Sequence, residues 1–385
     1  MYCRCVCALI LTLTATGCST FTSTSVGSGS THTYYVAADE VEWNYTPSGL
    51  DQMMGMPFMK GDPTIHTEHG PHRIGTIYRK ALYREYTDAT FTRLKPRPAS
   101  EQYLGALGPV LRGEVGETIR VIFKNNGTRP FSMHPHGVFY AKDSEGADYA
   151  DGTNAADKED GAVPPGKTHT YTWKLEERSG PGPNDPSSIV WLYHSHADEP
   201  KDVESGLIGA IIVARRGMTG PEGRPKDVDR EFVNLFMIYD ENTSWYFDHN
   251  IETYTTDPKG VKKLESSADA GDGNFDIGGA GFINANFKPT INGYMYANMP
   301  IMTMKKGERV RWYLVTIGEG PNFHTPHWHG NVVLQGGQRT DVISISPAQM
   351  ATVDMVPDDP GTWMYHCHVD EHMQAGMMAL YKVEP

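Results

Sequence analysis

The chain has 385 residues, of which 39% are hydrophobic and 21% charged, so it is long enough for two or three domains and too apolar for a disordered polymer. Its 40 glycines and 26 prolines argue against a helical bundle and favour many short strands joined by turns. With 34 basic and 47 acidic side chains, the net charge of −13 argues against binding to nucleic acid and attracts cations.

The first 30 residues have the pattern of an export segment. Residues 1–17 contain Arg4 and a short apolar run that ends in small residues, which is typical of a secretory signal and too short to span a bilayer. Cys18 follows these small residues and begins a Ser/Thr-rich tether at residues 18–30, which resembles a bacterial lipoprotein cleavage box; an ordinary cleaved signal is the alternative. We therefore expect export, either to the periplasm or to a lipid anchor at Cys18 on the outer side of the cytoplasmic membrane or in the outer membrane.

The folded body contains a single thiol. The other four cysteines lie in or at the end of the signal: Cys3, Cys5, Cys7 and Cys18. Cys367 therefore has no partner for an internal disulfide, although an exported protein would be allowed one. A lone thiol in that compartment needs another role.

The body is an internal repeat of strand-like runs and histidine motifs. In chain order the first half contains an alternating run at 119–123, His-Pro-His-Gly at 134–137, a strand-like run at 168–173, His-Ser-His at 194–196 and an apolar run at 207–213. The second half repeats these features at 310–315, 327–330, 352–356, 366–368 and 377–383. The repeat predicts two all-β units, at residues 31–215 and 231–385, with a Gly/Pro-rich charged linker at 216–230.

Four His-x-His pairs lie at corresponding positions of the two halves, where chance would give about one in the whole chain. They are His134/His136, His194/His196, His327/His329 and His366/His368. On a strand, residues i and i+2 project from the same face, so each pair presents two imidazoles side by side. Eight imidazoles exceed the needs of one four-coordinate ion and suit a cluster of several copper, zinc or iron ions.

Cys367 lies between His366 and His368, so on a strand its sulfur must point away from both. Three further candidate ligands lie near it in the sequence: His324, His372 and Met377. Two imidazoles, a thiolate and a weak thioether are the ligands of a blue-copper electron-transfer site. The alternation therefore predicts an electron-transfer copper and a metal cluster placed back to back.

The first half lacks such a site, because Ser195 takes the position of Cys367 and Pro200 that of His372. It can supply ligands to the cluster but cannot hold a blue copper. The two halves are therefore expected to have different functions.

These motifs resemble the four copper signatures of multicopper oxidases, over nearly the whole mature chain, and short flanking fragments such as residues 205–209 and 291–293 resemble ceruloplasmin-type modules. The resemblance implies two cupredoxin-like Greek-key β-sandwich domains with one type 1, one type 2 and two type 3 coppers per chain. It assigns the type 2 copper to His134 and His327, and the type 3 pair to the remaining six paired histidines. Those six are His136, His194, His196, His329, His366 and His368.

Two modules, with the blue copper in the second, look like the two-domain class of this family. That class implies a homotrimer whose cluster lies between the first domain of one subunit and the second domain of the next, a head-to-tail interface that closes into a ring. The implied reaction is one-electron oxidation of a donor coupled to four-electron reduction of O₂ to water, catalysed by a laccase-like or metal-oxidising enzyme. O₂ and a small donor are the expected partners.

The donor is left open between phenols or aromatic amines and the metal ions Fe²⁺ or Cu⁺. Glu371, directly before His372, resembles an acidic residue near the blue copper of iron-oxidising ceruloplasmin modules; a solvated turn residue is the alternative. Asp151 resembles the carboxylate beside the family's cluster, with Asp148 as a competitor and an ordinary loop acid as the alternative. The segment from Met53 to His72, rich in methionine and histidine, is a candidate copper-handling segment or a piece of core.

Two rival functions remain. A copper nitrite reductase would resemble this chain in its two cupredoxin domains but would need the blue-copper cysteine in the first half, where Ser195 lies. A non-catalytic copper-binding cupredoxin would need no histidine cluster.

Overall fold

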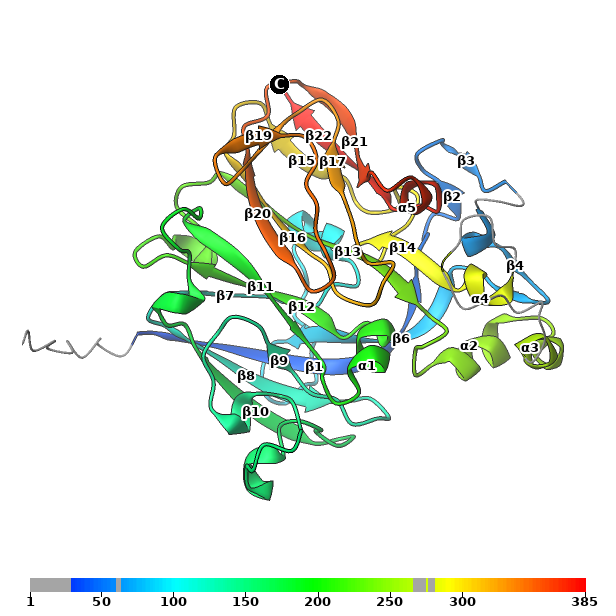
Figure 1. The fold of residues 1–385 in the computed structure, drawn as a ribbon, viewed down its shortest axis with the longest axis horizontal. Helices are drawn as coiled ribbons and strands as arrows, with labels where there is room; N and C mark the ends of the chain where they lie inside the picture. Colours follow the sequence, from blue (N-terminus) through cyan, green and yellow to red (C-terminus); the bar gives the residue numbers. More distant parts are fainter. Residues whose placement is uncertain (1–28, 60–63, 266–274, 276–280) are drawn as a thin grey trace, which may run out of the picture.

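The computed structural model describes residues 29–59, 64–265, 275 and 281–385 (Figure 1). The predicted signal, Cys18 and most of the tether lie outside these residues. The described chain is built of short strands with a few short helices, which confirms the all-β prediction.

Two four-stranded sheets face each other in the first domain. One has the order β10-β8-β1-β6, formed by β10 (Thr168–Lys174), β8 (Thr118–Asn125), β1 (Thr31–Asn44) and β6 (Ile77–Tyr86). The other has the order β7-β12-β11-β9, formed by β7 (Val110–Glu114), β12 (Ile208–Ala214), β11 (Ser188–His194) and β9 (His134–Pro135). Ile119, Val121 and Phe123 of β8 are fully buried between the sheets, as the two-residue period of a strand requires.

The second domain repeats this plan with a larger sheet. Its order is β14-β13-β16-β20-β18-β19, formed by β14 (Phe287–Ile291), β13 (Arg230–Asp240), β16 (Val310–Val315), β20 (Met350–Met355), β18 (Val333–Gln335) and β19 (Gln338–Thr340). The opposing sheet is β15-β22-β21-β17, formed by β15 (Met302–Lys305), β22 (Met378–Glu384), β21 (Gly361–Cys367) and β17 (Pro326–Trp328). Trp312, Trp328 and Tyr365 fill the space between the sheets.

Short helices and hairpins complete the chain. The α-helices are α1 (Glu199–Ser205), α2 (Phe247–Tyr254), α3 (Pro258–Glu265), α4 (Phe282–Ala285) and α5 (Asp370–Gln374). The 3₁₀ helices are η1 (Thr64–Thr67), η2 (Ala99–Leu104), η3 (Lys142–Ser144), η4 (Ala155–Lys158), η5 (Glu177–Ser179) and η6 (Pro221–Gly223). The two small hairpins are β2 (Leu50–Asp51) with β3 (Met56–Pro57) and β4 (His69–Gly70) with β5 (Arg73–Ile74). Within the described ranges no helix has the length and apolar character that crossing a membrane requires.

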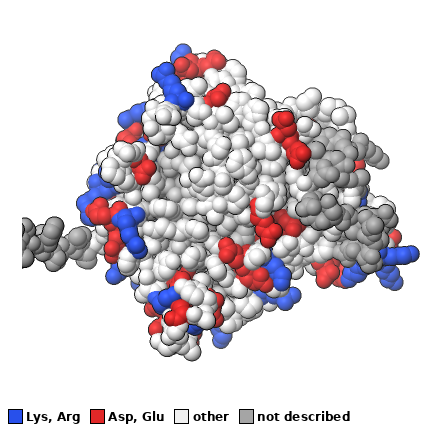
Figure 2. Space-filling view, in the orientation of Figure 1, with Lys and Arg blue, Asp and Glu red and all other residues white. Residues whose placement is uncertain are grey.

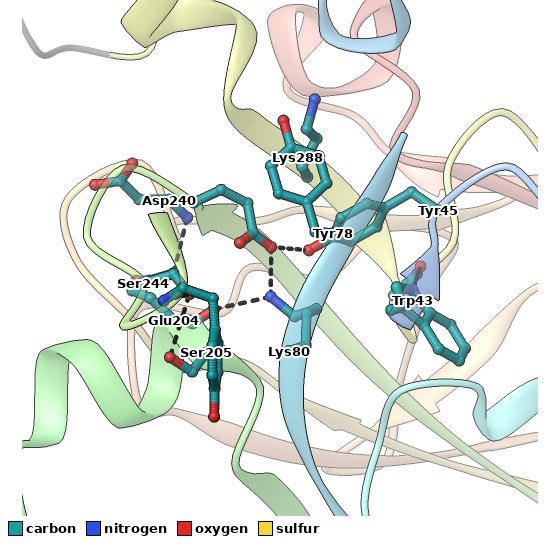
Figure 3. A network of polar contacts seen from close by, with 12 residues as sticks. Trp43, Tyr45, Tyr78, Lys80, Glu204, Ser205, Asp240, Ser244 and Lys288 are labelled. Atoms are coloured by element: carbon teal, nitrogen blue, oxygen red, sulfur yellow. Dashed lines mark hydrogen bonds and ion pairs between the residues drawn. The ribbon is translucent and has the colours of Figure 1, made fainter. Parts of the chain in front are cut away.

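The two domains share a buried interface. Strand β11 of the first domain packs against β16 and β20 of the second. Lys80 of β6 also forms a fully buried ion pair with Glu241, which follows β13, and donates to the main-chain carbonyl of Glu204 at 2.9 Å (Figure 3). Glu241 also accepts a hydrogen bond from Tyr45. Burying a charge is costly unless it is paired in this way, so the network is a satisfied polar contact between the two domains.

The surface charges are not gathered into one field on the face shown in Figure 2. Acidic and basic side chains lie mostly toward its margins, and its central area, over the second domain and the contact between the domains, carries few of them.

Candidate metal centres

The first-domain histidines form one compact group. His134 lies on β9, His194 ends β11, and the ligand nitrogens of His134, His136 and His194 all lie within 4.8 Å of one another. Nε2 of His136 is 3.1 Å from Nε2 of His194. The ring of His196 lies 5.2 Å from that of His134, so all four imidazoles meet at one place. Cross-strand pairing of His134 with His194 brings the two sequence motifs together.

The second-domain histidines form a matching group. His327 on β17 pairs across the sheet with His366 on β21, and their ring nitrogens Nδ1 and Nε2 are 3.1 Å apart. Nε2 of His329 is 3.0 Å from Nε2 of His366. The ring of His368 lies 5.1 Å from that of His327. Each domain therefore presents four imidazoles in the same arrangement.

Cys367 lies on the opposite side of its strand from these histidines. Its Sγ is 3.6 Å from Nδ1 of His372 and 3.9 Å from Nδ1 of His324, and the two Nδ1 atoms are 3.3 Å apart. All three side chains are buried. Met377 is also fully buried, and its carbonyl accepts the main-chain N–H of Cys367 at 3.1 Å. The alternation expected of a strand thus separates the thiol from its two histidine neighbours.

The donor atoms at Cys367 fit a copper ion. A point equidistant from three atoms separated in this way lies about 2 Å from each, which is the length of a metal–imidazole bond. Burial lowers the pKa of His372 to about 4 and that of His324 well below its usual value, so both imidazoles are neutral at physiological pH. Two neutral imidazoles, a sulfur and a nearby methionine are the ligand set of a blue-copper centre.

The histidine groups are also suited to metal binding. Burial lowers the pKa of His136 and His366 to about 4 and that of His194 to about 3, which keeps these nitrogens unprotonated. Nδ1 of His194 donates to the carbonyl of Ser195 at 3.0 Å, and Nδ1 of His366 donates to that of Cys367 at 2.7 Å. These bonds to main-chain carbonyls hold the rings with Nε2 free to coordinate, as is usual for metal-binding histidines.

One acidic residue that contacts the first histidine group was not among the candidates predicted from the sequence. Glu199 begins α1, and its Oε2 and Oε1 lie 3.1 Å from Nε2 of His196 and 3.9 Å from Nε2 of His194. The hydrogen bond to His196 is the main cause of a Glu199 pKa lowered to about 2, and the same bond raises the pKa of His196. The spacing His196-x-x-Glu199 at the start of a helix could have indicated the contact.

The two acids proposed from the sequence lie in different settings. Glu371 is exposed in the first turn of α5, directly before His372. Asp151 instead belongs to a surface loop, where its carboxylate contacts Lys142 at 2.7 Å and Lys158 at 3.4 Å. The hydrogen bond from Lys142 is the main reason that the pKa of Asp151 is lowered. Its carboxylate thus contacts lysines and Thr153, and not the histidine group beside which the family resemblance would place it.

Comparison with known proteins gives consistent results. Two profiles of the multicopper oxidase family match residues 101–218 and 271–385. Relatives include the mouse ferroxidase HEPHL1, 44% identical over 92% of this chain, human hephaestin, 40% identical over 92%, and human ceruloplasmin, 38% identical over 91%. The chain spans only 29%, 29% and 30% of their respective lengths.

Solved structures share the fold. A blue copper oxidase from Nitrosomonas europaea superposes with a TM-score of 0.55 at 19% identity, covering 92% of this chain and 86% of that one. A copper nitrite reductase from the same organism gives 0.53 at 16% identity, covering 92% and 94%. At these identities the likeness confirms the predicted cupredoxin fold but does not separate an oxidase from a reductase. The two family profiles show that this chain belongs to the multicopper oxidase family.

Proposed function

We propose that this protein is a multicopper oxidase that couples one-electron oxidation of a small donor to reduction of O₂ to water. The observation that carries the proposal is the position of Cys367, whose side chain faces one candidate copper site while His366 and His368 face another. His324, Cys367, His372 and Met377 would hold the type 1 copper, and the eight paired histidines one type 2 and two type 3 coppers. Bound copper supplies the one-electron redox chemistry and the binding and reduction of O₂.

The chain itself supplies the connection between the two sites and shields the Cys367 site from water. His366 and Cys367 end β21 and His368 follows directly, so three consecutive residues carry ligands to both sites. The covalent path between the sites is therefore only a few bonds long. The hydrogen bond from Nδ1 of His366 to the carbonyl of Cys367, 2.7 Å long, adds a contact between them. Cys367, His324 and Met377 show no exposed surface, and His372 only 5%, so a donor meets this site at the His372 edge.

Ferrous iron is the first candidate donor. Three of the relatives are named ferroxidase, hephaestin and ceruloplasmin, and Glu371 presents an exposed carboxylate beside His372. A hard carboxylate oxygen suits Fe²⁺, and the net charge of −13 draws cations toward the surface. Phenols and aromatic amines need only access to the same edge.

We further propose a homotrimer in which the four-histidine group of one subunit meets that of the next. The two groups are matched halves of an eight-imidazole set, each on its own domain, with His136 and His196 partly exposed and His368 exposed. The sparsely charged central area of the face in Figure 2 suits burial between subunits, because interface cores are depleted of charge. Export, with Cys18 as the point of lipid attachment, completes the proposal.

Metal content and oxygen uptake test the function together. Purified, copper-loaded protein should contain about four coppers per chain and consume O₂ when given Fe²⁺, Cu⁺ or a methoxyphenol. About two coppers per chain with turnover of nitrite would identify a reductase instead. Copper binding with no donor-dependent O₂ uptake would identify a carrier, and either result would overturn the proposal. Analytical ultracentrifugation should give the mass of three chains.

A further inference from the structure

Three methionines on a hairpin of the first domain lie outside any core. Met54, Met56 and Met59, on and after the β2–β3 hairpin, expose 69%, 41% and 67% of their surface. Methionine is ordinarily buried, where its flexible side chain fills gaps in a core. Three exposed thioethers within six residues therefore need another explanation than packing.

The hairpin is held in place by the second domain. The main-chain N–H of Gln52 donates to the carbonyl of Tyr296 at 3.1 Å, and the ring of Phe58 packs edge-on against that of Tyr296 at 5.2 Å. Tyr296 in turn donates its hydroxyl to the carbonyl of Gln374, the last residue of α5, at 3.2 Å. Figure 1 shows β2 and β3 beside α5, the helix that carries His372.

The chain that follows the hairpin reaches the same site by a second route. Thr64 at the start of η1 donates its hydroxyl to the carbonyl of Met59, which ties η1 to the end of the methionine segment. Two residues later the buried ring of His66 stacks on Phe275, with centroids 5.6 Å apart. Phe275 contacts His372 edge-on, again at 5.6 Å. One hydrogen bond and two ring contacts therefore connect the end of the methionine segment to the His372 edge.

We propose that Met54, Met56 and Met59 form a capture site for cuprous ion beside the His372 edge. Thioethers are soft ligands that select Cu⁺ and have little affinity for the harder Fe²⁺. Oxidation of the captured Cu⁺ rests on the proposed oxidase activity, whereas its capture does not. In that reaction four Cu⁺ ions lose one electron each and leave as Cu²⁺, while one O₂ takes up four electrons and four protons to give two waters.

Silver ion, which shares the ligand preferences of Cu⁺ but is not oxidised, is the probe for binding. Calorimetric titration of the fully copper-loaded protein with Ag⁺ should detect a site that the triple variant Met54→Leu/Met56→Leu/Met59→Leu weakens at least tenfold. Leucine conserves the volume, so the fold and the blue absorption should be retained. Met218→Leu, a partly exposed methionine in the linker, is the matched control and should bind Ag⁺ normally. Unchanged Ag⁺ affinity in the triple variant would overturn the capture site.

Kinetics then separate this inference from the function on which it rests. In the triple variant kcat/KM for Cu⁺ should fall at least tenfold, while the value for Fe²⁺ is unchanged. An equal fall for both donors would show a general disturbance of the His372 edge and would also overturn the capture site. Weakened Ag⁺ binding in a protein that consumes no O₂ with any donor would uphold the capture site as a binding site and refute the oxidase.

Discussion

Ser195 occupies in the first domain the place that Cys367 occupies in the second. The main-chain N–H of Ser132 donates to Oγ of Ser195 at 2.9 Å, and that of Thr325 donates to Sγ of Cys367 at 3.3 Å. The same backbone frame thus holds a hydroxyl in one domain and a thiol in the other. The hydroxyl donates to the carboxylate of Asp202 at 2.6 Å.

Restoring the thiol alone should not create a second blue site. The positions of His324 and Met377 are held in the first domain by Phe131 and Leu207, both fully buried and unable to bind copper. We expect Ser195→Cys to leave the copper content and the intensity of the blue absorption unchanged, as measured by metal analysis and visible spectroscopy. An added blue absorption band would show that a thiolate at position 195 is enough to create a blue-copper site without the other ligands.

The two proposed copper sites should be separable by a pair of substitutions. Cys367→Ser removes the thiolate and should abolish both the blue colour and O₂ uptake while about three coppers remain bound. His136→Ala removes a ligand of the histidine group and should keep the colour but stop O₂ uptake. Visible spectra, metal content and an oxygen electrode measure all three properties. Normal O₂ uptake by His136→Ala would refute the assignment of this histidine to the cluster.

Glu199 should orient the histidines that it contacts. Because its carboxylate lies 3.1 Å from Nε2 of His196, Glu199→Gln removes a charge next to the cluster ligands while keeping the shape of the side chain. Loss of such supporting contacts typically costs about 10- to 100-fold in metal affinity or activity. We expect a fall of this size in kcat or in retention of cluster copper, with the blue absorption intact. Glu177→Gln, an exposed surface change, is the control and should behave as the parent protein.

The buried ion pair between the domains should be sensitive to removal of one partner. Lys80 and Glu241 expose none of their side-chain surface. Lys80→Met leaves an unpaired buried carboxylate and should cost about 3–5 kcal/mol in the free energy of unfolding. Adding Glu241→Leu should recover much of that loss, because no charged group is then left buried without a partner. The midpoint of urea unfolding measures both effects, and a harmless Lys80→Met would mean that solvent reaches the pair.

The metal-free protein should lose stability in mild acid. Burial lowers the pKa of His136, His366 and His372 to about 4, whereas the same groups in the unfolded chain titrate near their ordinary value of about 6.5. Between these values the unfolded chain binds more protons, so the free energy of unfolding falls as the pH is lowered from about 6.5 to 4. Each group contributes at most about 1.4 kcal/mol per pH unit.

Urea unfolding of the metal-free protein across this range measures the slope. A variant with His372→Asn should show a shallower dependence than the parent chain. Stability that stayed constant from pH 6.5 to 4 would show that these imidazoles are already hydrated in the folded state.

Residue order alone determined the all-β fold, the repeat, the copper ligands as candidates and the opposed directions of Cys367 and its histidine neighbours. These features follow from the two-residue period of a strand, which is a local property of the backbone. Only the tertiary structure decided that Asp151 contacts lysines and that Glu199 reaches His196. It also decided that a hairpin ending at Phe58 packs on Tyr296, beside the candidate copper site of the other domain. Such contacts join segments that are up to hundreds of residues apart, and they are chosen by packing and charge pairing of the whole chain, which no local pattern records.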